Sequence, residues 1–216
     1  MSRTTRNRWL IYVLGCVCLA MGLALNTKAG LGVSPILSVS YSASVIWGWS
    51  LGNTTLVTYC VLILGQFVIR GENRRWRDLL QLPFSLVFSR VLDVLNGFIV
   101  YDASVHSLAE NLGVLAAATV LTGIGAAVMV NMDLISHPGD AIVQALAQRM
   151  GKEQGVAKNI FDVCCVIFTA CMTLVCAGEV VGISLGTVIA MVCIGRVVSL
   201  VNHLGREKMC RAAGLT

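Results

Sequence analysis

The segment GLALNTKAGLGVSP at residues 22–35 has a counterpart 103 positions later, GAAVMVNMDLISHP at residues 125–138. Each segment begins with glycine and ends with proline, and Ala24 and Leu31 meet identical residues at this offset. Further along, SRVLDVLN at 89–96 matches GRVVSLVN at 195–202 after a three-residue insertion. Proline, arginine and asparagine seldom agree by chance in apolar sequence. The spacing therefore predicts an internal repeat, with copies at residues 9–100 and 112–204.

The composition restricts the class of protein. Of 216 residues, 56% are hydrophobic and 12% are charged, and the mean hydropathy is +0.80. A soluble domain carries about a quarter charged residues, so this chain has too few polar side chains to cover a surface that faces water. Soluble, disordered and fibrous folds are excluded. We expect an all-α polytopic membrane protein with a single membrane domain over residues 1–216.

Apolar runs set the number of membrane spans. About 20 apolar residues cross a bilayer as one helix, and six runs have this length. We expect transmembrane helices at residues 9–27, 53–69, 80–100, 112–131, 157–177 and 183–204. Two further helical segments, 35–49 and 138–150, are too short or too polar to span, so we expect re-entrant or interfacial half-helices there.

Lysine and arginine predict the orientation. Twelve of the 16 basic residues fall at the two ends of the chain, between the second and third spans, and between the fourth and fifth. These twelve are Arg3, Arg6, Arg8, Arg70, Arg74, Arg75, Arg77, Arg149, Lys152, Arg206, Lys208 and Arg211. Basic residues mark the cytoplasmic side, so we expect a bacterial cytoplasmic (inner) membrane protein with both termini cytoplasmic.

The parity of the spans predicts how the two copies are related. Each copy has three spans, an odd number, so the second copy enters the membrane from the opposite side. We therefore expect an inverted 3+3 repeat in which each copy has three transmembrane helices and one re-entrant half-helix. Many secondary transporters have inverted repeats with broken helices and bind their solute near the midplane.

Several segments resemble a known family, the bacterial YczE/YyaS/YitT group of small integral membrane proteins. The similarity covers about residues 10–204, and the Lys158/Asp162 pair is its most specific part. The segments that carry it are GLALNTKAGLGVSPILSVSYSAS (22–44), SLGN (50–53), SHPGDAIVQALAQRMG (136–151), GVAKNIFDV (155–163) and LGTVIAMVCIGRVVSLVN (185–202). The resemblance implies an inner-membrane protein and supplies no substrate.

Two prolines are expected to start the half-helices. Pro35 and Pro138 follow Ser34 and His137, which can cap a helix, and proline at the first helical position has no N–H to lose. Helix starts inside the protein would present N–H groups and a positive dipole end that attract anions. In the alternative interpretation the prolines only start helices, and Asp140 only caps its own first turn. The sequence leaves both open.

Hydroxyl and amide side chains near these starts suit a small polar solute, an anion included. The expected substrate-binding residues are Asn26, Ser34, Ser38, Tyr41, Asn131, His137 and Asp140. The polar face of 35–49 needs partners at membrane depth, which are either other helices or a wet cavity.

Charges inside spans mark candidates for coupling or gating, because such charges are costly in a bilayer. Lys158 and Asp162 can pair across one helical turn. Asp162 would then carry a proton or cation, or the pair would only ease insertion. Arg196 would pair with Asp93 or Asp162, or Arg90 and Arg196 would extend to the lipid headgroups. The residues expected to couple or gate are Lys158, Asp162, Arg90, Asp93 and Arg196.

These features favour a secondary transporter or permease for a small polar solute. The rival is a non-transporting membrane protein, such as a substrate-capturing subunit or an accessory or regulatory partner. No nucleophile–base pattern, phosphate loop or metal-ligand spacing is found, so we expect no enzyme, cofactor, metal or nucleic-acid partner. Eight of the nine cysteines lie in apolar stretches and are expected to act as small apolar residues. The mass of 23.0 kDa favours a homodimer or a partner membrane subunit.

Overall fold

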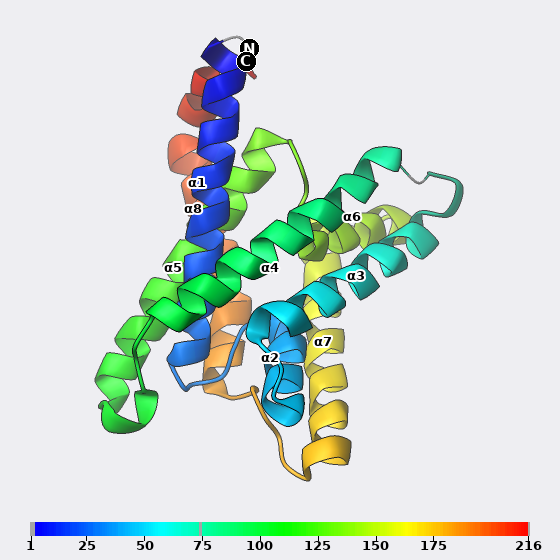
Figure 1. Cartoon of the computed structure of the whole chain (residues 1–216). Coiled ribbons are helices and arrows are strands. Elements are labelled where there is room, and N and C mark those ends of the chain that lie inside the picture. The colour runs from blue at the N-terminus through cyan, green and yellow to red at the C-terminus, as the bar shows by residue number, and fades with distance from the viewer. Residues whose placement is uncertain (1–2, 74, 216) are drawn as a thin grey trace. The chain divides into compact units, whose positions relative to one another are not determined.

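The computed structural model describes residues 3–73 and 75–215, whose regular secondary structure is entirely helical (Figure 1). The long helices are α1 (Arg3–Lys28), α3 (Leu51–Arg70), α4 (Gln81–Phe98), α5 (Leu108–Met132), α7 (Gln154–Ala177) and α8 (Leu185–Ala213). The shorter α-helices are α2 (Pro35–Trp47) and α6 (Pro138–Met150), and single 3-10 turns lie at Gly71–Asn73, Trp76–Leu80 and Ala103–Val105. Arg74, one of the basic residues used for the orientation, lies outside the described residues.

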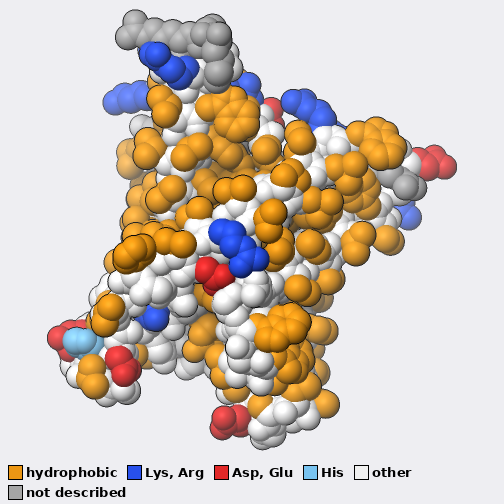
Figure 2. All heavy atoms as spheres, viewed as in Figure 1, with side chains coloured by type: hydrophobic (Ala, Val, Ile, Leu, Met, Phe, Trp, Pro, Cys, Tyr) orange, Lys and Arg blue, Asp and Glu red, His pale blue; other side chains and the backbone are white. Residues whose placement is uncertain are grey.

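The six long helices are each long and apolar enough to cross a membrane, which agrees with the six predicted spans and indicates a multi-pass membrane protein. Hydrophobic side chains cover much of the visible face in Figure 2. Large apolar residues on the long helices are strongly exposed, for example Val68 at 79% and Val175 at 85%. Such surfaces are suited to lipid contact. Some helices extend beyond the predicted apolar spans into polar sequence, as α8 does to Ala213.

The short helices begin at the predicted prolines, and each has 13 residues. At about 1.5 Å per residue they are roughly 20 Å long, which is less than the ~30 Å of a hydrocarbon core. Both end at a glycine in the left-handed region, Gly48 with φ 67° and Gly151 with φ 62°. Residues that carry a side chain rarely adopt this backbone conformation. The glycine therefore ends each helix after 13 residues.

The chain forms two compact units. The first comprises Met1–Gly30, Val94–Leu134 and Val192–Thr216, and contains α1, α5 and the last parts of α4 and α8. The second comprises Leu31–Asp93 and Ile135–Met191, and contains α2, α3, α6, α7 and the first parts of α4 and α8.

In the first unit, α1 and α5 lie side by side and antiparallel. Near the start of α1, the Arg8 side chain donates hydrogen bonds to the carbonyls of Met132 (2.7 Å) and Asp133 (2.6 Å), where α5 ends. Further along, Cys18 lies 3.4 Å from the carbonyl of Leu121. The two helices are therefore in contact both near the start of α1 and near its middle.

Two glycines make this contact possible. A Cβ on Gly22 would lie 2.5 Å from the backbone nitrogen of Thr122 and 2.9 Å from the carbonyl oxygen of Ala118. A Cβ on Gly125 would clash in the same way with the backbone of α1. Small residues let helix backbones approach closely in lipid, where the hydrophobic effect does not drive helices together. Backbone contact at these glycines therefore stabilises the first unit.

In the second unit, the two short helices pack against the same two long ones. Helix α2 packs against α3 and α7, and α6 packs against α3 and α7. A hydrogen bond of 2.9 Å between Ser38 and Thr169 links α2 to α7. Between α6 and α7 the contact is apolar and centres on Val143, Ala147 and Ala157.

Gly22→Ala tests the close approach. The added methyl group would overlap the backbone of α5, and overpacking costs typically about 1–3 kcal/mol, so we expect a melting temperature several degrees below wild type. Gly113→Ala in α5 is the matched control, because a Cβ there meets nothing within 4 Å. Alanine is the better helix former by up to ~1 kcal/mol, so this control should keep or raise the melting temperature. Equal melting temperatures for both variants would contradict the close packing.

Candidate functional site

His137 caps α6 with both its ring and its backbone. The ring nitrogen Nδ1 accepts the N–H of Gly139 at 3.2 Å, and the carbonyl of His137 accepts those of Asp140 (3.0 Å) and Ala141 (2.9 Å). Pro138 has no N–H. The first turn of α6 therefore has no free N–H group to offer an anion.

The same contacts fix the protonation state of the ring. Because Nδ1 accepts a hydrogen bond, the proton of the neutral imidazole is on Nε2. Nε2 lies 2.7 Å from the Tyr59 hydroxyl oxygen on α3 and donates to it. Aromatic rings of Tyr59, Phe84 and Phe88 meet the imidazole edge-on, at centroid distances of 4.8, 6.4 and 5.4 Å. His137 is thus buried, uncharged and held in place.

Lys158 and Asp162 form an ion pair on α7. The Lys158 ammonium lies 2.9 and 3.2 Å from the two carboxylate oxygens of Asp162. The Asp162 side chain is 1% exposed and that of Lys158 is 32% exposed. The carboxylate is therefore buried, whereas the lysine lies between the interior and the surface.

The start of α6 and the first half of α7 bring four predicted residues together. Asp140 donates its backbone N–H to the carbonyl of His137 at 3.0 Å, and α6 packs against α7, which carries Lys158 and Asp162. With Tyr59, which binds His137, these residues form what we term the α6–α7 polar cluster. Two of its members were expected to bind the solute and two to couple or gate, and they lie on two helices that pack against each other.

Hydroxyl groups of α2 bind other parts of the second unit. Ser38 bonds to Thr169 (2.9 Å) and to the carbonyl of Pro35 (2.7 Å), while Ser42 donates to the carbonyl of Val181 at 2.7 Å. Ser34 is buried, and Tyr41 is half-buried. The sequence left open whether other helices or a wet cavity would satisfy this polar face. For Ser38 the partner is Thr169 on α7, and for Ser42 it is the carbonyl of Val181 in the loop after α7.

Two predicted substrate residues belong to the first unit. Asn26 on α1 is 3% exposed. Asn131, at the end of α5, donates from its amide nitrogen to the amide oxygen of Asn202 at 2.6 Å. A related contact of 3.2 Å joins Thr27 at the end of α1 to Asn96. The candidate substrate residues are therefore divided between the units.

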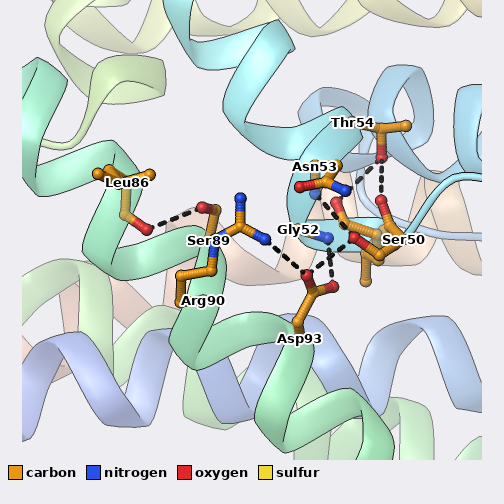
Figure 3. Close-up of polar contacts among 9 residues, drawn as sticks. Ser50, Gly52, Asn53, Thr54, Leu86, Ser89, Arg90 and Asp93 are labelled. Atoms are coloured by element: carbon orange, nitrogen blue, oxygen red, sulfur yellow. Dashed lines mark hydrogen bonds and ion pairs between the residues drawn. The ribbon is translucent and has the colours of Figure 1, made fainter.

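Asp93 caps the start of α3 (Figure 3). Its carboxylate accepts the N–H of Gly52 at 2.6 Å and the hydroxyl of Ser50 at 2.9 Å, and it lies 3.6 Å from the Arg90 guanidinium. A Cβ on Gly52 would overlap α4, so glycine permits this approach. Arg90 is thus the observed ion-pair partner of Asp93, whereas Arg196 lies exposed on α8.

Helix α3 also carries buried polar atoms without a partner. The hydroxyl of Thr55 and both amide atoms of Gln66 have no hydrogen-bond partner among the described residues, and both side chains are fully buried. They share this helix with Tyr59, and with Arg70, which pairs with Asp78 and donates to Gln144 of α6 at 3.2 Å. Such groups cost about 1–3 kcal/mol each when unsatisfied.

Thr55, Tyr59, Gln66 and Thr169 were not among the functional residues expected from the sequence. The repeat offset was an available signal for Tyr59, which aligns with Asp162, whereas Gln66 and Thr169 align only with each other. Within residues 3–73 and 75–215, no group of three or more His, Cys, Asp or Glu side chains could hold a metal ion.

Stability measurements can test the ion pair. Lys158→Met leaves Asp162 buried without a counter-ion, and breaking a buried pair costs roughly 3–5 kcal/mol. We expect a smaller loss here, because Lys158 is 32% exposed. Lys158→Met combined with Asp162→Leu should recover most of the stability, because both charges are gone. A double variant less stable than the single one in thermal unfolding would contradict simple pairing.

Comparison with known proteins identifies a family. No curated protein and no solved structure matches the chain. The sequence profile of a family of unknown function, DUF6198, matches residues 6–203, which include every helix of the two units except the ends of α1 and α8. The chain therefore belongs to the family DUF6198.

Proposed function

We propose that this protein is a secondary transporter or permease for a small polar solute in the bacterial cytoplasmic membrane. In this proposal the six long helices span the bilayer, α2 and α6 are re-entrant half-helices, and both termini are cytoplasmic. The two copies, at residues 9–100 and 112–204, form an inverted 3+3 repeat. The resemblance to the YczE/YyaS/YitT group supports the choice of membrane.

The symmetry of the contact between α1 and α5 carries the proposal. Gly22 packs against Thr122 and Ala118, and Gly125 packs against Leu19 and Gly15. Adding 103 to residues 22, 19 and 15 gives residues 125, 122 and 118, so each contact has its exact mate in the other copy. Because the two helices are antiparallel, the operation that exchanges them is a two-fold rotation about an axis perpendicular to both.

Other contacts are similar in the two copies, although the first of them is one residue away from the 103-residue offset. Thr27 with Asn96 in the first copy corresponds to Asn131 with Asn202 in the second, since each pair joins the end of a copy's first helix to the asparagine of the aligned octapeptide. In the second unit, α2 against α7 corresponds to α6 against α3. Inverted repeats with short helices are typical of secondary transporters.

Buried charges support a solute pathway over a purely structural role. Charged side chains inside membrane proteins are costly and usually mark substrate or ion pathways. We propose that Asp162, with Lys158 as its partner, couples transport to a proton or cation. Asp93 with Arg90, together with Arg196, would gate. His137 and Asp140, with Ser34, Ser38, Tyr41, Asn26 and Asn131, are the proposed substrate-binding residues.

Uptake into proteoliposomes tests this proposal. The purified protein is reconstituted alone and given a defined mixture of amines, amino acids, carboxylates and sugars, and the lumen is analysed by mass spectrometry. We expect at least one solute to accumulate above protein-free liposomes. Asp162→Asn should abolish this uptake while the protein remains folded, because the amide cannot carry the charge.

Asp133→Asn is the matched control. Asp133 is exposed and has a left-handed backbone with φ 44°, a conformation that asparagine also tolerates. This variant loses the same charge and should transport like wild type. No accumulation of any solute would contradict transport and favour a substrate-capturing or accessory subunit. If the Asp162→Asn variant takes up the solute as well as wild type, Asp162 does not couple transport.

A further inference from the structure

The start of α1 lies beside the end of α8 (Figure 1). The side-chain amide of Asn7 donates to the carbonyl of Ala212 at 3.4 Å, and a Cβ on Gly214 would lie 2.9 Å from the Cβ of Thr4. Both helix ends belong to the first unit. They therefore form one continuous end of that unit.

Three basic side chains at this end are exposed. Arg6 lies near the start of α1, and Arg206 and Lys208 lie near the end of α8. None of the three has a hydrogen-bond or ion-pair partner within residues 3–73 and 75–215. We term these three residues the terminal basic cluster.

Other charges at this end do not neutralise the terminal basic cluster. Arg211 pairs with Glu207 on α8. The Arg8 guanidinium donates to carbonyl oxygens at the end of α5, so its positive charge remains uncompensated. Asp133, which supplies one of these carbonyls, contributes one exposed carboxylate. Four uncompensated positive charges thus stand against one negative charge.

Helix α1 changes from basic to apolar along one face. Trp9, Leu10 and Leu14 follow Arg6 at spacings of three, four and eight residues, and all three are exposed. Residues three or four apart lie on the same face of a helix. Tryptophan is enriched where lipid headgroups meet the hydrocarbon core, so the position of Trp9 is typical of a membrane interface.

Helix α8 has the same arrangement in the opposite chain direction. Leu204 and Leu200 precede Lys208 by four and eight residues, and both are exposed. Because α8 ends where α1 begins, both faces are basic at the shared end and apolar further from it. A small anion matches only the basic part of such faces, whereas a lipid with an anionic headgroup matches both parts.

We propose that this end of the first unit binds anionic glycerophospholipids. Their phosphate groups lie at Arg6, Arg206 and Lys208, and their acyl chains lie along the exposed apolar residues of α1 and α8. Basic residues clustered beside a membrane span are typical of binding sites for anionic lipid headgroups. The inference goes beyond the proposed function and requires no transport.

Thermal unfolding of the purified full-length protein in an uncharged detergent tests the lipid site. Phosphatidylglycerol should raise the melting temperature in a saturable way, because a ligand that binds only the folded state stabilises it. Phosphatidylcholine with the same acyl chains has no net charge and should give a smaller rise. Glycerol 3-phosphate carries the phosphate without acyl chains and should give no saturable rise.

A triple variant locates the binding. Each basic residue near an anionic lipid surface contributes about fivefold in affinity. Replacement of all three cluster residues should therefore weaken the phosphatidylglycerol response at least tenfold in concentration. The variant is Arg6→Gln/Arg206→Gln/Lys208→Gln. If it does not fold, Lys208→Gln alone should weaken the response by about fivefold, and an unchanged response would contradict the proposal.

A second triple variant is the matched control. It removes three exposed basic residues of the second unit and should respond to phosphatidylglycerol like wild type. The control is Arg75→Gln/Arg77→Gln/Lys152→Gln. An equal loss in both triple variants would show an effect of net charge and overturn the site.

Further results would overturn the lipid site. These are equal responses to phosphatidylglycerol and phosphatidylcholine, and a saturable rise with glycerol 3-phosphate, which would show an anion site instead. Proteoliposome uptake separates this inference from the proposed function. Phosphatidylglycerol binding by a protein that transports nothing would leave the lipid site standing and overturn transport. Uptake by a protein with no preference for phosphatidylglycerol would do the reverse.

Discussion

The backbone contact between α1 and α5 is the constraint on which the rest of this account depends. Helices in lipid gain no hydrophobic energy from each other, so they associate through close packing and hydrogen bonds. At Gly22 and Gly125 no side chain separates the two backbones, and Arg8 adds charge-assisted hydrogen bonds to the carbonyls at the end of α5. Because the contact at each glycine is the mate of the contact at the other, one packing arrangement would serve both copies of the proposed repeat. Such a shared packing arrangement is what an inverted repeat would produce.

The second unit departs from this symmetry where side chains carry charge. Tyr59 and Asp162 occupy matched positions in the repeat, and so do Gln66 and Thr169. One member of each pair is bonded in a way that the other is not: Thr169 binds Ser38, whereas Gln66 is buried without a partner. Asp162 accepts hydrogen bonds from the Lys158 ammonium group, whereas the Tyr59 hydroxyl is hydrogen-bonded to the uncharged imidazole of His137. In the proposed repeat the two copies differ in polar chemistry, so the proposed coupling function lies on the α6–α7 side.

Much of the fold could be predicted from the sequence because its causes are local. Apolar length sets the six long helices, and Pro35 and Pro138 fix the starts of the short ones. The Lys158–Asp162 contact follows from a spacing of four residues on one helix. The remainder depends on partners distant in the chain. Thr169 lies 131 residues from Ser38, and a threonine in an apolar run carries no sign of that bond. The capping role of His137 was predicted from its place before Pro138 and is confirmed, whereas that of Asp93 was missed, since it depends on a side chain of α4 meeting the start of α3.

Side-specific labelling of the two short helices tests the inverted repeat most directly. Single cysteines are placed near Ser44 in α2 and near Gln148 in α6, in a variant whose nine native cysteines are replaced. A membrane-impermeant maleimide is applied to intact cells and to permeabilised cells. The account predicts that the position near Ser44 is labelled from outside and the position near Gln148 only after permeabilisation. Labelling of both positions from the same side would contradict it.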